Sequence, residues 1–571
     1  MSDLIIKAGL VVDGTGAHAQ RLDIRVRGGR ITEMAANLRS DGETVIDAGG
    51  AIVAPGFIDS HTHYDATIYW DPMLDPMPQH GVTTVVIGNC SLGLAPMRPA
   101  DRKSQVDAYS YIEDVPVELL NSAIPWRWQS YGDYARALLE EKLGVNLVSF
   151  VGHSQIRTFV MGQESWSRAA SVAEIKSMAA ELDQALAAGA RGLSFSRYDK
   201  DRHGRPVPSC HADEAELDAL CAVLARYDAC LQFVPGGTDT TDNLLTELAW
   251  VAARIRPHGV TALYNIAVHV DADPERSTRV IAYLETLRTA GIRLYAMASP
   301  RPFELSISIK QTIAFLDAPA WNELVQVSPE RKRAMLVDAG WRARARIDAD
   351  SSASIMFPFS HPQDLRISTV GKAKNREWIG RSFDKLIALE GGHVSDVLTD
   401  WLLDNDCDAT FTYPIANTNQ DEVVKLLKSP VTFVSGSDAG AHLQMFCAAG
   451  DATLLLSRYV RDRGDFSVEA AIHELTGRQA ELLGLRDRGV LAPGKAADIT
   501  IFALEELKYG PEFPVNDVAG GYARLTRDPG GYRYTIVNGE IVQRNGTATG
   551  ALPARWLREP TQVTAMEGSS L

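Results

Sequence analysis

The sequence has few cysteines and lacks the long apolar runs of a membrane protein. Its 571 residues include six cysteines, which lie far apart and form no C-x-x-C pair. In a chain of this size, such spacing favours reduced thiols and a cytoplasmic setting over a disulfide framework. A membrane-spanning helix needs about 18 consecutive apolar residues, and no such run occurs; the first residues also lack the pattern of an export signal. We therefore expect neither a membrane span nor export.

Positive charge is also in short supply. The chain has 57 Lys and Arg residues against 72 Asp and Glu residues, which gives a formal net charge of -15. This excess of negative charge repels nucleic-acid phosphates and anionic membranes, so neither is an expected partner. The 45% hydrophobic and 23% charged composition is that of a globular protein with a sizeable core. Small molecules remain as the expected partners.

Both ends of the chain have the alternating pattern of apolar and polar residues that predicts short β-strands. Residues 3–50 alternate in this way and are punctuated by Gly-containing turns, and the pattern returns in residues 494–502 and 534–542. Neither end has enough strands to close a core alone. We expect residues 1–54 and 485–548 to meet in one small β-sandwich.

The middle of the chain, residues 55–484, alternates strands with amphipathic helices. Eight such strands predict an α/β fold of the (β/α)8 TIM-barrel type, in which the chemistry gathers where the strands end. Residues 300–430 form an expected insertion before the last strand, which either covers the mouth of the site or makes a homo-oligomer contact. The first expected strand ends at the histidines described next, and the others cover residues 82–88, 146–151, 192–196, 230–234, 261–266, 293–297 and 431–435.

Two histidines stand two residues apart in the stretch from Pro55 to His63. An apolar segment of strand type, residues 51–54, precedes them. Side chains alternate between the two faces of a strand, so His61 and His63 project to the same side while Thr62 points away. Imidazole nitrogens held on a rigid backbone suit a divalent metal ion. The alternative is that two polar residues merely close a strand.

A carboxylate stands at the end of the last expected strand. Asp438 lies in the segment SGSDAGAH, residues 435–442. At the mouth of a barrel it could bind a metal ion and also take a proton from the water that the ion activates. The alternative is that Asp438 caps the following helix. Together with the two histidines, the pattern favours the catalytic role.

Six motifs follow one another along nearly the whole chain: PGFIDSHTHYD, GVTTVVIGNCSLGLAP, VGHSQIR, SGSDAG, LAPGKAADITIF and VNGEIV. In this order they resemble the N-acyl-D-amino-acid deacylase (D-aminoacylase) branch of the amidohydrolase superfamily. The resemblance implies the barrel, the sandwich built from both ends, zinc, and hydrolysis of an amide. It also implies that His61, His63 and Cys90 face the metal site, and that Asp438 acts as general acid and base and as a further ligand.

The sequence departs from this family at the ends of the fifth and sixth strands. There the family has two histidines that complete a zinc site shared with the cysteine. The corresponding segment 231–237 has no imidazole, and in segment 264–269 the histidine, His269, stands later than the family pattern places it. We therefore expect one Zn²⁺ ion rather than two, held by His61, His63 and Asp438 with Cys90 near.

Three further residues have both a functional and an ordinary interpretation. Cys90 follows the second strand, but a lone cysteine is often a small buried hydrophobe. His153 could orient a substrate, and Arg197 could bind its carboxylate in a two-point fork. A structural histidine and a solvated surface arginine are the alternatives. The segment around His153 only faintly resembles a serine-hydrolase elbow, because Ile156 stands where the second glycine is required.

The sequence thus predicts a metal-dependent hydrolase that cleaves the amide bond of a small N-acylated substrate. The metal ion activates water, and Asp438 moves the proton to the leaving nitrogen. One alternative keeps the same site but cleaves a lactone, a cyclic imide or another carbonyl compound. Another is a ligand-binding protein that retains the fold without catalysis, because a fold does not fix a function.

Overall fold

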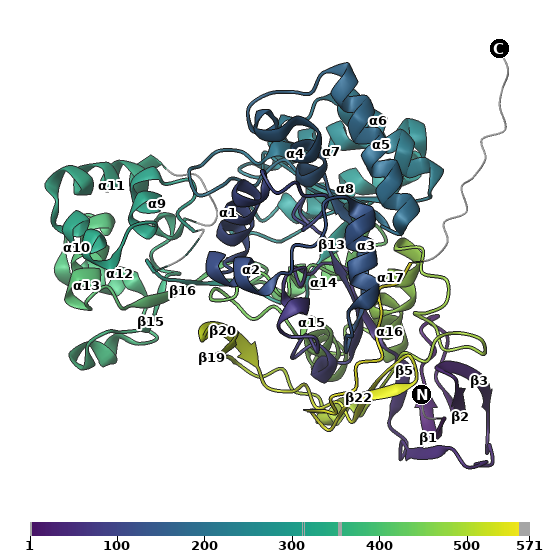
Figure 1. Ribbon diagram of the computed structural model, residues 1–571. Helices are drawn as coiled ribbons and strands as arrows, with labels where there is room; N and C mark the ends of the chain where they lie inside the picture. Colours follow the sequence, from purple (N-terminus) through teal and green to yellow (C-terminus); the bar gives the residue numbers. More distant parts are fainter. Residues whose placement is uncertain (1–2, 311, 313, 352–356, 559–571) are drawn as a thin grey trace.

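Short parallel strands, each followed by helices, occupy the centre of the protein (Figure 1). The computed structural model describes residues 3–310, 312, 314–351 and 357–558. One parallel sheet has the order β17-β13-β12-β11-β10-β9 and a second has the order β6-β7-β8. The strands are β6 (Phe57–Asp59), β7 (Val82–Ile87), β8 (Asn146–Ser149), β9 (Val151–Gly152), β10 (Gly192–Ser196), β11 (Cys230–Val234), β12 (Ala262–Tyr264), β13 (Leu294–Ala298) and β17 (Thr432–Val434).

These strands are buried on both faces, because helices cover the outer one. All six residues of β7 are buried, which explains its unbroken run of β-branched residues. Helix α5 begins after Ser171, whose hydroxyl forms a capping box with Glu174, and the helix ends at Gly189. The covering helices include α1 (Arg102–Glu113), α2 (Val117–Ala123), α3 (Tyr131–Glu140), α4 (His153–Met161), α5 (Val172–Ala188), α6 (Glu214–Arg226), α7 (Thr241–Ile255), α8 (Arg276–Thr289) and α14 (Gln420–Lys428).

The two ends of the chain share one nine-stranded sheet at the lower right of Figure 1. Its order is β23-β22-β21-β18-β5-β1-β2-β3, with β4 paired to β1. Its strands are β1 (Leu4–Val11), β2 (Gln20–Arg27), β3 (Arg30–Ala35), β4 (Thr44–Asp47), β5 (Ile52–Pro55), β18 (Ile499–Phe502), β21 (Tyr534–Val537), β22 (Glu540–Arg544) and β23 (Thr547–Ala548).

The apolar stretch that leads to the two histidines contributes to two different sheets. The apolar segment before the histidines is β5, which pairs with β1 and β18 rather than with the parallel strands. The parallel strand is β6, and it begins only at Phe57. Gly56 separates the two strands and passes so close to Thr83 that a Cβ atom would lie 2.1 Å from that side chain. The chain can therefore change sheets there without losing the burial of either strand.

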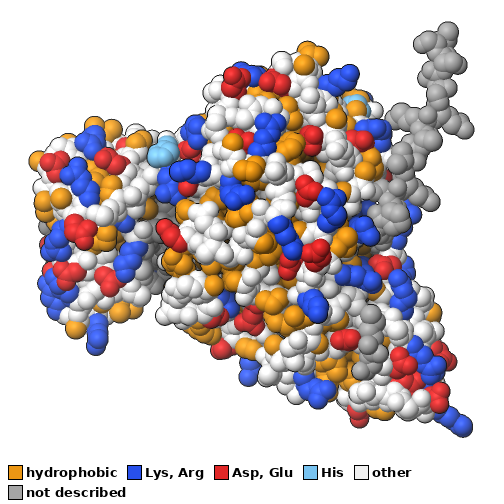
Figure 2. Space-filling model, in the orientation of Figure 1, with side chains coloured by type: hydrophobic (Ala, Val, Ile, Leu, Met, Phe, Trp, Pro, Cys, Tyr) orange, Lys and Arg blue, Asp and Glu red, His pale blue; other side chains and the backbone are white. Residues whose placement is uncertain are grey.

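The segment between β13 and α14 forms a lobe at the left of Figure 1. Figure 2 shows this lobe set off from the main body, with Lys and Arg mixed among Asp and Glu on its surface. Helix α14 contacts α8 and β17, so it belongs to the central layer rather than to the lobe. The lobe contains β14 (Phe303–Ile307), α9 (Pro319–Val325), α10 (Pro329–Val337), α11 (Ala339–Ser351), β15 (Arg366–Thr369), α12 (Phe383–Glu390), α13 (Val394–Asp404) and β16 (Thr410–Ala416).

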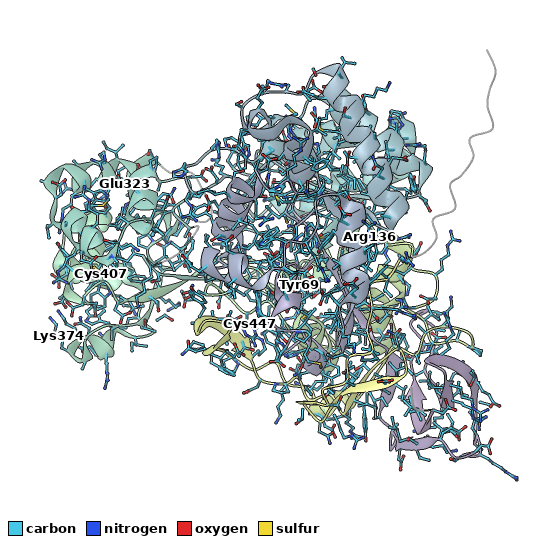
Figure 3. All side chains as sticks on the ribbon, in the orientation of Figure 1. Tyr69, Arg136, Glu323, Lys374, Cys407 and Cys447 are labelled. Atoms are coloured by element: carbon cyan, nitrogen blue, oxygen red, sulfur yellow. The ribbon has the colours of Figure 1, made fainter. Side chains whose placement is uncertain are left out.

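A β-hairpin and several further helices complete the described chain. The hairpin is formed by β19 (Glu512–Val518) and β20 (Tyr522–Arg527), and Cys447 lies beside it, whereas Cys407 lies in the lobe (Figure 3). All six cysteines are free. None of the helices in the described part of the chain combines the length and the apolar character that crossing a membrane requires.

Candidate metal centre

Two imidazoles, a thiol and a carboxylate converge just beyond the ends of the parallel strands. The ligand atoms of His61, His63 and Cys90 lie within 4.8 Å of one another, and all three side chains are buried. The Nε2 atom of His61 is 3.3 Å from the sulfur of Cys90. One carboxylate oxygen of Asp438 lies 3.4 Å from Nε2 of His61 and 3.1 Å from Nε2 of His63.

These distances suit one divalent cation. Four ligands held tetrahedrally at about 2.0–2.3 Å from an ion lie roughly 3.3–3.8 Å from one another. The separations between the imidazole, sulfur and carboxylate atoms are close to that range before any ion draws them in. Nitrogen and thiolate donors are also the ligands that zinc prefers. The residues therefore fit a single zinc-like ion.

Backbone hydrogen bonds fix the two histidines from both sides. The N–H group of Thr62 donates to Val86 at the end of β7, and the N–H group of His63 donates to Ala439 in the loop after β17. Thr62 thus pairs with Ala439 in an isolated parallel bridge. This segment lies beyond β6 rather than within it, so the two histidines are held by neighbouring strands and not by strand alternation alone.

The loop that carries Asp438 has a constrained backbone. Asp438 has a φ of 65°, and its N–H group donates to the carbonyl oxygen of His61 at 3.1 Å. Gly440, with a φ of 89°, passes so close to the backbone of His63 that a Cβ atom would lie 3.0 Å from the His63 carbonyl carbon. A side chain at Gly440 would push the two loops apart. The glycine therefore keeps the carboxylate within reach of both imidazoles.

Helix α1 contributes a carboxylate that the sequence did not point to. Glu113 ends this helix, is buried, and has one oxygen 3.0 Å from Nδ1 of His63. Tyr109, one helical turn earlier, donates its hydroxyl to the carbonyl oxygen of His63. His63 therefore has a carboxylate on each side of its ring, with Glu113 at Nδ1 and Asp438 at Nε2. A carboxylate behind a ligating imidazole fixes the tautomer of the ring and makes it a better ligand.

Two side-chain amides lie beside Cys90: Gln232 is within β11, and Asn265 follows β12 directly. The side-chain oxygen of Gln232 accepts the backbone N–H of Cys90 at 2.8 Å. The side-chain nitrogen of Asn265 lies 3.3 Å from Nε2 of His61 and 3.7 Å from the sulfur of Cys90. Cys90 itself has a φ of 54°, and these contacts hold it in that conformation. His269, four residues after Asn265, does not join the cluster: its Nε2 atom lies 3.2 Å from a carboxylate oxygen of Asp271.

Burial is a main influence on the pKa values of the side chains in this cluster. Burial raises the pKa of the Cys90 thiol to about 12 and lowers the pKa of His442 to about 4. Burial opposes ionisation of Asp438, but hydrogen bonds with His61 and His63 outweigh it and hold the pKa of Asp438 well below its ordinary value. Burial also lowers the pKa of His63, but the charge of Glu113 and the bond to Asp438 raise it well above the usual value. A cation at this position would instead favour neutral imidazoles and a thiolate.

A cavity of about 260 Å³ opens beside the cluster. Asp438 is partly exposed to it, and His442 lies 3.5 Å from the carboxylate of Asp438. Strand β14 of the lobe forms part of its wall through Phe303 and Leu305. Much of the remaining wall is apolar, and its polar groups include Asn265, Tyr198, Asp199 and Arg276.

Two residues predicted to bind substrate lie elsewhere. His153 is buried and bonded to Glu216 at 2.7 Å, while Arg197 pairs with Glu247 at 2.7 Å and stacks over Trp250. Neither residue lines the cavity beside the metal cluster. Their substrate-binding roles therefore stay predictions, and neither side chain would contact a substrate bound in this cavity.

A buried set of imidazole, thiol and carboxylate donors beside a cavity is typical of hydrolases that activate water with a divalent cation. The chain belongs to the amidohydrolase family, whose sequence profile matches residues 44–289 and 387–543. The gap in the match, residues 290–386, falls on β13 and most of the lobe.

Individual relatives narrow this assignment. The chain is 30% identical to an uncharacterized protein of Mycobacterium tuberculosis, over 95% of this chain and 92% of that protein. It is 28% identical to an N-acyl-D-aspartate deacylase of Alcaligenes xylosoxydans xylosoxydans, over 88% and 86% of the two chains. A solved D-aminoacylase structure, studied for its binuclear metal center, superimposes with a TM-score of 0.67 at 25% identity, covering 98% of this chain and all of that one. The predicted metal-dependent amidohydrolase of the D-aminoacylase branch is confirmed.

Sequence reasoning and structure agree on part of this site. The structure brings together His61, His63, Cys90 and Asp438, which lie in three separate motifs of the sequence. Glu113 and Arg276 were missed, because neither stands in a recognisable motif. In a sequence alone, a single Glu or Arg at a helix end is most readily interpreted as an exposed surface residue. Only their burial in the folded chain distinguishes them.

Proposed function

We propose that the protein is a deacylase that hydrolyses small N-acyl-D-amino acids with the help of one Zn²⁺ ion. The observation that carries this proposal is the convergence of His61, His63, Cys90 and Asp438 at one end of a substrate-sized cavity. The relatives with named activities act on N-acyl-D-aspartate, on N-acyl-D-glutamate or as a D-aminoacylase. These names suggest N-acyl-D-amino acids as the substrate class. The cluster could hold the ion that activates water for hydrolysis of the amide bond.

The two imidazoles and the thiolate of Cys90 would hold the ion, with Asp438 as an additional ligand. When bound, zinc makes water acidic enough to ionise near neutral pH and polarises the scissile carbonyl. Asp438 would accept the proton of the attacking water, because its carboxyl group is ionised and one of its oxygens faces the cluster. The same carboxyl group returns the proton to the amide nitrogen as the carbon–nitrogen bond breaks. The products are a carboxylic acid and a free amino acid.

The residues around Cys90 support one ion rather than two. The resemblance places two histidines near the ends of the fifth and sixth strands, and here the side chains beside Cys90 in those segments are the amides of Gln232 and Asn265. A neutral amide is a poor zinc ligand beside imidazole and thiolate. Gln232 is moreover engaged with the backbone of Cys90. The cluster of His61, His63 and Cys90 is thus left with donors for a single ion.

The architecture behind this site is best described as one closed (β/α)8 barrel. The two parallel sheets are continuous at Phe150, which separates β8 from β9, and the bridge between Thr62 and Ala439 links β6 to the end of β17. Both observations support closure into a ring of eight strand positions. Residues 55–484 would form this barrel domain, and residues 1–54 with 485–548 the sandwich. A cytoplasmic setting and a homo-oligomer stay predictions.

The test combines metal analysis with a substrate panel. Purified protein is assayed for bound metal and for release of free amino acid from N-acetyl-D-amino acids, with the L-enantiomers, lactones and cyclic imides alongside. We expect about one zinc per chain, turnover of D-substrates, and a loss of about 10²- to 10⁴-fold in kcat for Asp438→Asn. Turnover confined to the lactones or imides, or turnover that survives both chelation and Asp438→Asn, would reject the proposal.

A further inference from the structure

Arg276 is a buried cation that lines the same cavity as the metal cluster. It opens helix α8, its residue is 5% exposed, and it borders the cavity together with His63, Cys90 and Asp438. One nitrogen of its guanidinium group donates to the carbonyl oxygen of Thr238 at 3.0 Å. A guanidinium group has five N–H donors, so this single bond leaves most of its donors available.

No carboxylate of the described residues forms an ion pair with Arg276 within 4.0 Å. Two nearby acids have other hydrogen-bond partners: Asp239 accepts two hydrogen bonds from Asn243, and Asp273 accepts one from Thr241. The bonds from Asn243, with a smaller contribution from the charge of Arg276, lower the pKa of Asp239. Of the acids that line the cavity, Glu113 contacts His63, Asp199 is bonded to Ser196, and Asp438 contacts the two histidines. Among the described residues, Arg276 therefore has no carboxylate in direct contact with its guanidinium group.

An unpaired buried charge is costly, because the protein interior solvates it poorly. Such a group is retained where a ligand supplies the missing partner, and a guanidinium group matches a carboxylate in a two-point fork. Arg197, which pairs with Glu247 outside the cavity, shows the contrasting case of an arginine satisfied within the protein. The guanidinium group of Arg276 is thus available to bind an anionic group of a ligand in the cavity.

We propose that Arg276 binds the α-carboxylate of the substrate, while the apolar wall receives its side chain. This inference rests on the proposed deacylase function and specifies the substrate class: an N-acyl amino acid with a free carboxylate and an apolar side chain. Beside Arg276 the wall is built from Val234, Val268 and Tyr264, and the lobe adds Phe303 and Leu305. An acidic side chain would meet no further cation there, because Arg276 is the only Lys or Arg among the described residues that line this cavity.

The inference is tested by binding in a background that does not turn over. In Asp438→Asn protein, the affinity for N-acetyl-D-leucine is compared with that for N-acetyl-D-leucinamide by calorimetry. The two ligands differ only in the charge of the carboxyl group. We expect the acid to bind about 10- to 100-fold more tightly than the amide, which is the range for a charge-assisted hydrogen-bonded pair. Adding Arg276→Met should abolish this preference and leave the amide's affinity within about twofold.

Two variants separate recognition from folding. Arg276→Lys keeps the positive charge and should retain part of the preference. Arg279→Met removes an arginine of the same helix that pairs with Asp242 and does not line the cavity, and it should retain all of the preference. Equal weakening of acid and amide by Arg276→Met would show a merely structural role and overturn the inference. So would the absence of any preference when Arg276 is present. The proposed function fails on a different result: a preserved preference for the acid with no turnover of any N-acyl amino acid by the wild-type enzyme.

Discussion

The Nδ1 atom of His63 lies 3.0 Å from a carboxylate oxygen of Glu113, and both side chains are almost completely buried. This contact joins a helix between the second and third strand positions to the metal cluster. Because the other ring nitrogen of His63 faces Asp438, a carboxylate at this position favours a proton on Nδ1 and leaves Nε2 free to bind an ion. Glu113 is thus a positioning residue for the cluster, although it does not reach the ion itself.

We predict that Glu113→Gln weakens zinc binding by about 10- to 100-fold, because the amide keeps the shape of the side chain but loses the charge that strengthens His63 as a ligand. The affinity is measured by competition with a chromophoric chelator. The adjacent Asp114→Asn is the matched control: its carboxylate accepts the backbone N–H of Gln444 and does not border the cavity. Unchanged zinc affinity in Glu113→Gln, or an equal loss in Asp114→Asn, would remove Glu113 from this role.

A second prediction concerns the number of ions. Wild-type protein dialysed against zinc should retain about one ion per chain, because Gln232 and Asn265 offer amides where the family resemblance places imidazoles. The double variant Gln232→His with Asn265→His should retain about two, with Cys90 shared between them. Elemental analysis after gel filtration gives both numbers. Two ions in the wild type would show that other groups complete a second site.

The sequence was most informative where function depends on residues close together in a motif. The His61 and His63 pair, and the position of Asp438 after the last strand, predicted atoms that lie 3.1 to 3.4 Å apart although some 375 residues separate them. This succeeded because parallel strands bring their ends to one edge, so that motif order along the chain becomes proximity in space. The strand positions themselves were predicted to within a residue or two, as in β7 and β10.

The sequence was least informative where a role depends on what a side chain does not contact. Arg197 and Arg276 look alike in the sequence, and only folding shows that Arg197 pairs with Glu247 whereas Arg276 has no such partner among the described residues. The point at which the chain passes from the terminal sheet to the parallel strands is likewise not marked in the sequence. Both β5 and β6 are apolar, and the change of sheet depends on the close approach of Gly56 to Thr83.

The two faces of β14 allow a third prediction. Phe303 and Leu305 face the cavity beside the metal cluster, whereas Glu304 and Ser306 border a separate, more polar cavity on the other side of the strand. Leu305→Ala should raise the KM for N-acetyl-D-leucine about tenfold, because it removes apolar surface from the wall. Ser306→Ala should leave that KM unchanged. Steady-state kinetics with both variants tests this, and equal effects would show that the strand does not present Leu305 to substrate.

The last prediction concerns His80 and the decrease in the free energy of unfolding at acidic pH. His80 is completely buried, with Nδ1 2.8 Å from the hydroxyl of Thr453. Burial, together with the charge of Arg527, lowers the pKa of His80 to about 3, whereas an unfolded histidine has a pKa of about 6.5. Below about pH 6.5, His80 binds a proton in the unfolded chain but stays neutral in the folded chain. The free energy of unfolding therefore decreases as the pH falls.

Between pH 7.5 and pH 5.0 this single group should remove roughly 2 kcal/mol of stability. His80→Gln cannot take up the proton, so its free energy of unfolding should change less than that of the wild type over the same range. Urea titrations at the two pH values give the difference. The exposed His18→Gln is the control and should follow the wild type. If His80→Gln loses as much stability on acidification as the wild type does, the folded protein accommodates a charged His80, and the buried position beside Thr453 does not exclude the proton.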